Sequence, residues 1–431
     1  MSSTHTTLCI VNTSGIDITN IEVSEVDNYD WGGNSRPDRN FQGITLPNNN
    51  SPGEREELNN WSNSAWYRMT LTFSDGTNLT FRNDQKDAKT KFNRSLDAGG
   101  SATDKLTLYQ TSGGGTNAIY IREKQAPDNS RWMGELLTKK PDVKLNAITM
   151  PGSHDAGMNL THDCTVGVQP EWARTQVYSI NDQLKAGSRY FDLRVYYKES
   201  NYFIGHFDSV PVIGNSGCYG SPLATVLAQV KNFVQSDTGK SETVILKFSH
   251  TMDSSPEGYS VREVTKYVID EVKSIFESYL YTSSNTQANL GEILLSQLSG
   301  KVVAVFDKEY EDDVKNGIFP DRYAKVKEYG LRVYDQYSGT GSYSEMSEDQ
   351  QKKLTDKGGY GNDYLFLLSW TLTGKLGSLD IQVLSTLANP WLPQILTKIK
   401  KEELKPANII YYDFVDAYIN RAIIDLNYWR S

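Results

Sequence analysis

The stretch from Ile148 to Leu160, ITMPGSHDAGMNL, decides how the rest of the sequence is interpreted. An apolar lead-in, 145–150, stops at Pro151-Gly152, and the polar triplet Ser-His-Asp at 153–155 follows. A short apolar run that ends at Pro-Gly is typical of a buried strand followed by a tight loop. In α/β folds the loops at the carboxyl ends of strands carry the chemistry. We therefore expect a strand at 145–150 and a functional site beside His154.

Four further polar residues lie within or directly after strand-like runs. His206 comes after the run Tyr202 to Gly205, and RYFDLRVYY (189–197) lies between the two histidines. Because strand side chains alternate, Asp192 and Arg194 face the same side. Near the C-terminus NIIYYDFVD places Asp413 at the end of the last expected strand.

The composition is that of a soluble globular protein. Of its residues, 38% are hydrophobic and 23% charged. The length of 431 residues predicts two domains. A net charge of −9 argues against nucleic acid as a ligand and against capture by a membrane through bulk electrostatics. No apolar run is long enough for a membrane span. The N-terminus, MSSTHTTLCIVN, shows no signal peptide, so a cytoplasmic location stays open beside a secreted or peripheral membrane one.

The three cysteines, Cys9, Cys164 and Cys218, do not have the spacing of a metal site or a disulfide framework. Cys164 and Cys218 fall in expected loops after the two histidine-bearing strands. A bridge between them and two free thiols in a reducing compartment are both compatible with the sequence.

Residues 1–125 are predicted to form an all-β sandwich. Alternating runs are separated by Gly, Asn, Asp and Pro, and Ser-Asp-Gly-Thr at 74–77 lies between TLTF and NLTF, which indicates a hairpin. Trp31, Trp61 and Trp66 suit either the core of this module or a surface that binds lipid or sugar. We expect a membrane-binding or glycan-binding module, with core packing as the alternative.

From Arg131 to the end, strand-like runs alternate with amphipathic stretches such as 222–236 and 259–280. The expected strands are 145–150, 189–195, 202–206, 242–248, 301–306, 331–335, 364–370 and 408–413. About eight strands, mostly with helical crossovers, predict a closed parallel TIM-type barrel over 131–431. The connection from 195 to 202 has no room for a helix, so the barrel is expected to be distorted and the fold class to be α/β.

Two histidines at strand ends of one barrel suit acid–base chemistry on a phosphodiester. One takes a proton from the nucleophile and the other gives a proton to the leaving group. The fork of Arg194 matches phosphate oxygens, and Asp413 would hold the His154 ring in one tautomer. A single histidine at a strand end is more often structural, and an Asp-x-Arg is more often a rim ion pair. The order of these pieces around a barrel favours a site.

The motifs WM…KLNAITMPGSHDAGM, RYFDLRVYY, IGHFD and ETVILKFSH resemble the X region of phosphatidylinositol-specific phospholipase C, and more narrowly its bacterial, metal-independent branch. The resemblance covers about 131–430 and implies a distorted TIM barrel. It also implies attack by the inositol 2-hydroxyl on phosphorus, with release of diacylglycerol and a cyclic inositol phosphate.

The resemblance also implies roles for individual residues. His154 would be the general base and His206 the general acid, with Asp413 orienting His154. Arg194 would contact the phosphate, and Asp155 would act on the leaving-group side through His206 or the lipid oxygen.

The headgroup site is expected to differ from that of the bacterial relatives. VYDQYSG (333–339) matches the family's V-x-D-x-Y pattern, so Asp335 would bind inositol hydroxyls and Tyr337 would stack on the ring. Where the relatives carry a Lys and an Arg, this sequence has Ser249 and Asp307, the latter followed by Lys308. Lys247 and His250 are the candidate substitutes, and Asp192 and Lys247 complete the expected substrate-binding set.

No metal and no other cofactor are expected. The calcium-dependent animal relatives place an Asn after the first histidine and acidic ligands on the second and fourth strands. Here Asp155, Arg194 and Ser249 hold those places, and an arginine replaces the ion by a fixed positive charge. The expected partner is phosphatidylinositol or a glycosyl-phosphatidylinositol lipid in a membrane surface, bound by a monomer.

The apolar segment 371–396, with Trp391 between two prolines, suits membrane insertion at the barrel rim. Its alternative interpretation is an ordinary amphipathic barrel helix with Trp391 packed inside.

Two other functions remain open. One is a phosphodiesterase for another phospholipid headgroup, which would need Mg²⁺ and is disfavoured by Arg194. The other is an inactive barrel that acts as a binding or toxin-like protein, which the intact His154 and His206 disfavour.

Overall fold

A computed structural model describes residues 4–29, 35–58, 65–85, 97–210, 214–253, 261–285, 288–307, 317–320, 330–374 and 380–429. Trp31, Trp61 and Lys308 therefore lie outside the described residues. The chain forms two compact units. The first is Met1–Pro127 together with Val383–Glu403, and the second is Asp128–Gln382 together with Leu404–Ser431.

The strands of the first unit form two four-stranded sheets, with strand orders β3-β1-β8-β7 and β2-β4-β5-β6. All neighbours are antiparallel except β1 and β8. The strands are β1 Thr4–Thr13, β2 Ile18–Asp27, β3 Gly53–Leu58, β4 Ala65–Phe73, β5 Asn78–Gln85, β6 Asp97–Gly99, β7 Leu106–Gly113 and β8 Thr116–Glu123. The expected hairpin at 74–77 joins β4 to β5.

The two sheets of the first unit share one hydrophobic core. Leu8 and Ile10 of β1 lie in the same cluster as Met69 and Leu71 of β4. A short helix, α1 (Pro37–Asn40), belongs to this unit, so its N-terminal part is not purely β.

Helices α7 (Ile381–Ala388) and α8 (Leu392–Lys400) bring Trp391 to the first unit. Trp391 packs against Cys9, Val11, Ala118 and Tyr120, which lie on β1 and β8. Because strand side chains alternate, Cys9 and Val11 point away from the core that Leu8 and Ile10 fill. Trp391 thus covers the second face of this sheet.

The second unit contains a curled, mainly parallel sheet. Its strand order is β15-β14-β13-β10-β9-β18-β17-β16, and the β11–β12 hairpin extends from β10. The strands are β9 Met150–Ser153, β10 Tyr190–Lys198, β11 Asn201–Val210, β12 Gly214–Pro222, β13 Thr243–Asp253, β14 Lys301–Phe306, β15 Ile318–Pro320, β16 Val333–Asp335, β17 Leu365–Trp370 and β18 Ile409–Tyr412. No pairing joins β15 to β16 within the described residues, so the sheet is open there.

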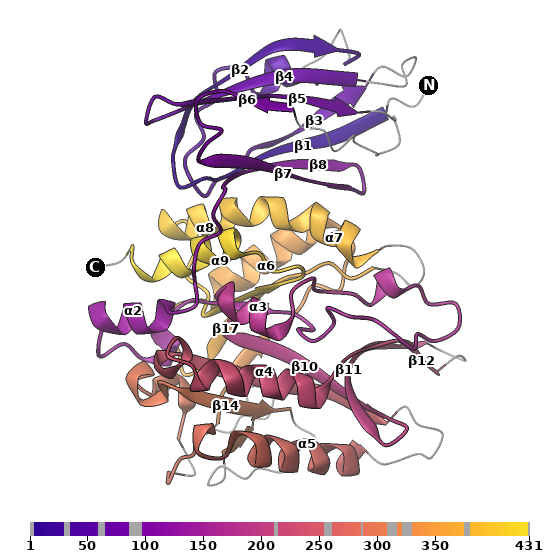
Figure 1. Cartoon of the computed structure of the whole chain (residues 1–431), viewed down its shortest axis with the longest axis vertical. Coiled ribbons are helices and arrows are strands. Elements are labelled where there is room, and N and C mark those ends of the chain that lie inside the picture. Colours follow the sequence, from indigo (N-terminus) through magenta and orange to yellow (C-terminus); the bar gives the residue numbers. More distant parts are fainter. Residues whose placement is uncertain are drawn as a thin grey trace. The chain divides into compact units, whose positions relative to one another are not determined.

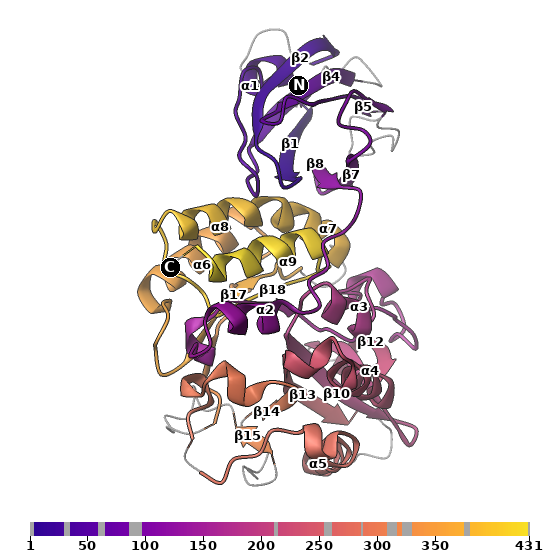
Figure 2. The ribbon, with the colours of Figure 1, turned by 60° about the vertical axis from the view of Figure 1, so that its left-hand side comes forward.

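Helices cover the outer face of this sheet (Figures 1 and 2). The helices of the unit are α2 Trp132–Lys139, α3 Ile180–Lys185, α4 Leu223–Gln235, α5 Val261–Phe276, α6 Tyr343–Lys357 and α9 Ala417–Ile424. Val226 of α4 and Val268 of α5 pack with Leu193 and Leu246. The alternate residues Tyr190 and Ile245 lie in the other cluster, so Asp192, Arg194 and Lys247 face the inside of the curl.

The strand expected at 145–150 is wrong in its position. Leu145–Ala147 form a 3₁₀ helix, and β9 begins at Met150 and includes Pro151 and Gly152. Proline fits inside this strand because its carbonyl accepts the N–H of Arg189 and it has no N–H of its own to pair. The Pro-Gly pair is therefore part of the strand and not a turn.

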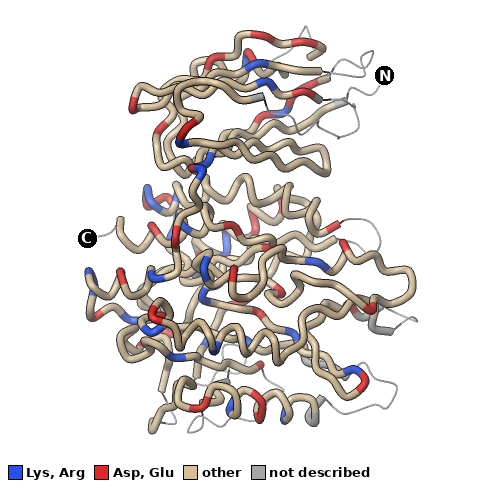
Figure 3. Tube along the Cα trace, viewed as in Figure 1, with Lys and Arg blue, Asp and Glu red and all other residues tan. Residues whose placement is uncertain are grey.

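Acidic and basic residues are interspersed along both units (Figure 3). Among the described residues, no helix combines the length and the hydropathy needed to cross a membrane.

Candidate active site

The residues of the candidate site come from neighbouring strands of the curled sheet. His154 and Asp155 follow β9, Asp192 and Arg194 lie on β10, and Asp413 follows β18. Because β18 and β10 both pair with β9 in parallel, the side chains at these strand ends meet. Strand β9 is therefore the centre of the site.

His206 reaches the site in a different way from that expected. It lies inside β11, an antiparallel partner of β10 that continues to Val210, and not at the end of a parallel strand. Gly217 of β12 lies so close that a Cβ at this position would be 1.9 Å from the carbonyl oxygen of His206. A glycine is thus required where β12 passes His206.

His154 is held on both ring nitrogens. Its Nδ1 lies 2.7 Å from Oδ1 of Asp413, and Nη2 of Arg194 lies 3.0 Å from its Nε2. These contacts suit the neutral ring, with Nδ1–H donating to Asp413 and Nε2 accepting from Arg194. Burial lowers the pKa of His154, but Asp413 and Asp155 outweigh burial and raise the pKa to about 9. His154 is therefore a stronger base than an ordinary histidine, and the neutral ring that accepts from Arg194 prevails above about pH 9.

Asp155 joins the two histidines. Its Oδ2 lies 2.5 Å from Nδ1 of His206 and 3.8 Å from Nε2 of His154. Burial would raise the pKa of this carboxyl, but Arg194 and the two imidazoles hold it well below its ordinary value. Asp155 thus stays ionised, and both rings approach the same carboxylate oxygen.

The guanidinium of Arg194 lies among the acidic groups. Its Nε lies 2.6 Å from Oδ1 of Asp155, and the two atoms form an ion pair, but the N–H does not point in the direction that a hydrogen bond requires. Nη2 lies 3.2 Å from Oδ2 of Asp192. Burial lowers the pKa of Arg194, but Asp155 and Asp192 raise it by a larger amount. The net pKa lies above the ordinary value for arginine, so the side chain stays charged.

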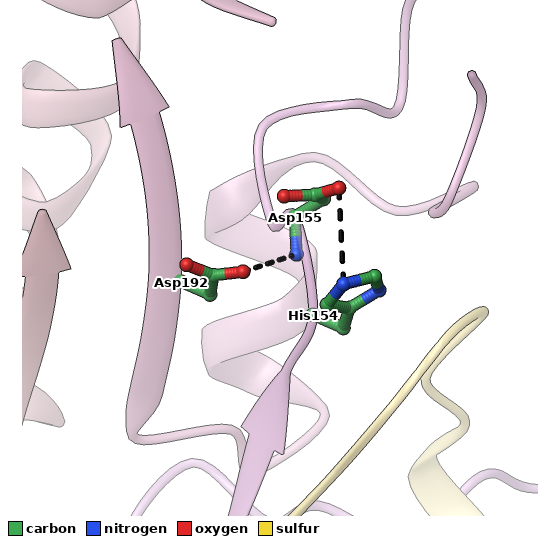
Figure 4. A group of neighbouring side chains, drawn as sticks. All are labelled: His154, Asp155 and Asp192. Carbon is green, nitrogen blue, oxygen red and sulfur yellow. Dashed lines mark hydrogen bonds and ion pairs between the residues drawn. The ribbon is translucent and has the colours of Figure 1, made fainter. Parts of the chain in front are cut away.

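His154, Asp155 and Asp192 are the one group of described residues whose spacing would allow a metal ion, since their ligand atoms lie within 4.8 Å of one another (Figure 4). Each of the three is in contact with Arg194. The guanidinium therefore already supplies a positive charge to every member of this group.

The other candidate residues differ in burial. Asp192 is buried and accepts a hydrogen bond from Ser249 Oγ at 3.1 Å, and the buried Lys247 is its register partner on β13. Asp335 at the end of β16 is exposed, and Tyr337 is 63% exposed. These residues form a more open part of the site than the histidine centre.

Asp335 belongs to the same inner face of the sheet as Asp192. Burial raises the pKa of Tyr411 well above its ordinary value, and the charges of Asp335 and Asp192 raise it further. The carboxylate of Asp335 therefore lies near enough to Tyr411 to raise the pKa of its hydroxyl.

Three residues of the site were not identified from the sequence. Tyr411 packs edge-on against the His154 ring, with 5.2 Å between the centroids. The period of two that relates Tyr411 to Asp413 is a signal that identifies it. Thr175 and Gln176, both fully buried, bond to the loops that carry His154 and Asp413, and no pattern in the sequence indicates them.

The loop after β9 is also tied to the β11–β12 hairpin. Cys164 and Cys218 form a disulfide, and Cys218 is the register partner of His206. Of the two states that the sequence left open, the structure has the bridge.

The chain is similar to several known proteins. Residues 148–308 match the family described as phosphatidylinositol-specific phospholipase C, X domain. A 1-phosphatidylinositol phosphodiesterase of Listeria monocytogenes is 24% identical over 308 residues, which cover 70% of this chain and 87% of that protein. A PI-PLC X-box domain-containing protein of Dictyostelium discoideum is 25% identical over 216 residues, and this chain spans only 26% of its length.

Among solved structures, phosphatidylinositol-specific phospholipase C from Listeria monocytogenes aligns with a TM-score of 0.51 at 22% identity. The alignment covers 70% of this chain and 99% of that one. At this identity the likeness shows the fold. The segment that matches the phosphatidylinositol-specific phospholipase C X-domain family contains β9, β10, both site histidines and Arg194.

Proposed function

We propose that this protein is a phosphatidylinositol-specific phospholipase C that cleaves its substrate by acid–base catalysis with two histidines. The observation that carries the proposal is the convergence of His154 and His206 on Asp155, with Arg194 beside them. The family match and the relatives that act as 1-phosphatidylinositol phosphodiesterases support the same reaction.

In the first step His154 takes the proton of the inositol 2-hydroxyl at Nε2, and the hydroxyl oxygen attacks phosphorus. The bond from phosphorus to the diacylglycerol oxygen breaks. His206, held at Nδ1 by Asp155, gives its proton to that oxygen from the other ring nitrogen. The products are diacylglycerol and a cyclic inositol phosphate, and the two histidines exchange their protonation states.

A carboxylate holds each of the two rings. The carboxylate of Asp413 favours the imidazolium that His154 becomes, as its effect on the pKa of His154 indicates. Asp155 lies 2.5 Å from Nδ1 of His206 and orients that ring. Each histidine therefore has its own acidic partner.

Arg194 would neutralise the phosphate in place of a metal ion. Its contacts with Asp155, Asp192 and His154 support this role, since a cation bound to the same three residues would meet the guanidinium. We infer that the reaction needs no divalent cation. A chelator that abolishes turnover would contradict this inference.

The headgroup would lie toward the open end of the curled sheet. Asp335, Tyr337, Asp192 and Lys247 are the candidates for the inositol hydroxyls and ring. Asp335 and Tyr337 are exposed to an incoming ligand, whereas Lys247 and Asp192 are buried and would act from the floor of the site. Replacing Asp335 with Ala should raise KM more than it lowers kcat.

At the level of architecture, we infer a distorted TIM barrel for the second unit and a β-sandwich for the strands of the first. The strand order around β9 supports the barrel. The hydrophobic core shared by the two four-stranded sheets supports the sandwich. The corresponding domains are 1–125 and 131–431, with the addition that 383–403 pack with the first.

The lipid surface would meet the segment between β9 and α3. Four large apolar side chains of this segment are exposed: Leu160 (58%), Val166 (100%), Val177 (54%) and Tyr178 (37%). They follow His154 closely in the chain, and exposed apolar residues at the rim of a site can enter a membrane interface. Trp391 is less suited to insertion because it packs against Cys9 and Val11.

Replacing Val166 with Asp tests this membrane contact. Cleavage in phosphatidylinositol vesicles should fall, because a charge resists the interface. Cleavage of a soluble short-chain substrate should stay unchanged, because Val166 is fully exposed and takes part in none of the hydrogen bonds described for the site. Equal loss on both substrates would count against the contact.

The first unit is proposed to target the protein to lipid or glycan. Trp66 on β4 is partly exposed, and the guanidinium of Arg82 lies 3.9 Å from its ring centroid. The test compares the full chain with Trp66→Ala on liposomes and on immobilised glycans. The full chain is needed because removing residues 1–127 would uncover Trp391. Retention that is equal for both proteins on every surface would refute a role for this face.

The disulfide favours an oxidising compartment, so we infer that the protein acts on membranes outside the cytoplasm. We also propose that it acts as a monomer.

One assay tests the function as a whole: release of cyclic inositol phosphate from phosphatidylinositol vesicles, with and without a chelator. We expect turnover that survives the chelator and falls by roughly 10²–10⁴-fold in His154→Ala and in His206→Ala. Turnover only on another phospholipid and only with Mg²⁺ would favour the alternative phosphodiesterase. No turnover on any phospholipid would favour a binding or toxin-like protein.

A further inference from the structure

Beyond Ser153 and Tyr412 the two loops that carry His154 and Asp413 leave the sheet. The β9–β18 ladder ends at this pair, and the one further backbone bond between the loops, from His154 N–H to the Tyr412 carbonyl, is 3.4 Å long. The hydrogen bond between His154 and Asp413 therefore needs another source of support, because two loops held only at their base can move apart.

A buried dipeptide, Thr175-Gln176, connects the two loops. The side-chain amide of Gln176 donates to the carbonyls of His154 (3.0 Å) and Tyr412 (3.3 Å), and its Oε1 accepts the N–H of Val415 (3.0 Å). Gln176 is 0% exposed, so water cannot replace these bonds at low cost.

Thr175 holds the two strained positions of the site. Asp155 and Phe414 have positive φ angles of 39° and 55°, a backbone conformation that residues other than glycine rarely adopt. Thr175 Oγ1 donates to the carbonyl of Asp155 at 2.8 Å, and the Thr175 carbonyl accepts the N–H of Phe414 at 2.7 Å. Such conformations persist where surrounding bonds enforce them, and here one residue bonds to both.

We propose that Thr175 and Gln176 are positioning residues that hold the His154 loop against the Asp413 loop and so maintain the catalytic hydrogen bond between them. Their side chains bond to backbone atoms of the two loops. The inference rests on the proposed function for its kinetic consequence, but the arrangement of the two loops is independent of the substrate.

The charged groups around His154 define what loosening the loops should do. Asp413 faces its Nδ1, Asp155 and Arg194 lie near its Nε2, and the Tyr411 ring packs on its side. Asp413 alone depends on the second loop. If that loop moves away, His154 loses its acidic partner but keeps Arg194, so it becomes a weaker base.

The test compares Gln176→Met with a matched variant, Gln350→Met. Gln350 is also 0% exposed, also donates twice, to the Gln336 carbonyl and to Ser338 Oγ, and also accepts one backbone N–H, that of Ser369. It lies on α6 and has no bond to the loops of His154 or Asp413. Both variants should lower Tm to a similar extent.

In Gln176→Met, kcat should fall roughly 10²-fold with KM within about twofold, since small misplacements of reacting groups cost rate. The acidic limb of kcat/KM should move to lower pH. The downfield proton NMR signal of the His154 Nδ1–H, which a carboxylate partner produces, should weaken or disappear. In Gln350→Met the signal and the pH profile should stay as in the unaltered protein.

A second pair of variants keeps the test decisive if Gln176→Met does not fold. Thr175→Val removes the bond to Asp155 and keeps the shape of the side chain, whereas Thr175→Ser keeps the hydroxyl. We expect Thr175→Val to behave as Gln176→Met and Thr175→Ser to retain the signal and most of the rate. An intact His154 signal and equal kcat in Gln176→Met and Gln350→Met would overturn the inference. No turnover by the unaltered protein would refute the proposed function, and the NMR comparison would then decide the positioning role by itself.

Discussion

Nδ1 of His206 lies 2.5 Å from Oδ2 of Asp155, although 51 positions separate them in the chain. The two residues meet because β11 folds back along β10, which itself pairs with β9. Each histidine of the site thus has a carboxylate partner from a different strand, Asp155 for His206 and Asp413 for His154.

Replacing Asp413 with Asn should reduce kcat by at least about 10²-fold, because the His154 ring loses the partner that sets its tautomer. Removing the negative charge also lowers the pKa of His154 from its raised value of about 9. His154 must be neutral to act as a base, so the acidic limb of kcat/KM should move to lower pH. A pH–rate profile measures this, and an unchanged limb would show that Asp413 does not act on His154.

The same substitution should change how stability depends on pH. The folded-state pKa of His154 lies above its ordinary value of 6.5, so protonation of the ring stabilises the folded state. This contribution is complete below about pH 6.5 and is lost as the pH rises through about 9. The free energy of unfolding of Asp413→Asn should therefore differ most from that of the unaltered protein at low pH. Urea titrations at pH 6 and pH 10 compare the two.

Arg194→Ala should lose most of its turnover, because the phosphate charge is no longer neutralised and Asp155 and Asp192 lose their cation. Added guanidinium should restore part of the rate by entering the space that the side chain leaves. Arg194→Lys should recover less than full activity, since an ammonium cannot contact Asp155, Asp192 and His154 with one planar fork. Full activity in Arg194→Lys would show that charge alone is sufficient.

Reducing the Cys164–Cys218 disulfide should destabilise the second unit. The bridge spans 54 positions, and closing a loop of this size typically contributes roughly 2–4 kcal/mol. Thermal unfolding with and without a reductant measures the loss, and the double variant Cys164→Ser/Cys218→Ser is the control that should no longer respond to reductant. The remaining cysteine, Cys9, is buried in the first unit and should not contribute.

Glu242→Gln should destabilise the protein by about 3–5 kcal/mol without moving the pH profile of catalysis. The fully buried carboxylate of Glu242 binds Arg189 at 2.7 Å and accepts the N–H groups of Met133 and Gly134. Its removal leaves the buried guanidinium of Arg189 without its acidic partner. The exposed pair Lys240–Asp237 offers the control, because Lys240→Gln should cause no measurable change in urea unfolding.

The sequence accounts well for the strands whose apolar runs have clear ends. The runs expected at 301–306 and 364–370 correspond to β14 and β17, and the expected helix at 222–236 corresponds to α4. The sequence does not predict a strand that forms because a neighbouring strand pairs with it and not because of its own composition. Strand β12 contains Asn215, Ser216 and three glycines, and it is a strand because β11 pairs with it.

The sequence by itself predicted the ionisable side chains that the structure brings together: two histidines, an arginine and three aspartates. These follow from local motifs, since alternation along a strand fixes which side chains share a face. Only the tertiary structure showed that Asp155 contacts His206, of the two partners expected for it, that Trp391 packs on β1 and β8, and that Thr175 and Gln176 bond to the loops of His154 and Asp413. Each of these depends on contacts between residues far apart in the chain, and local sequence patterns carry no record of such contacts.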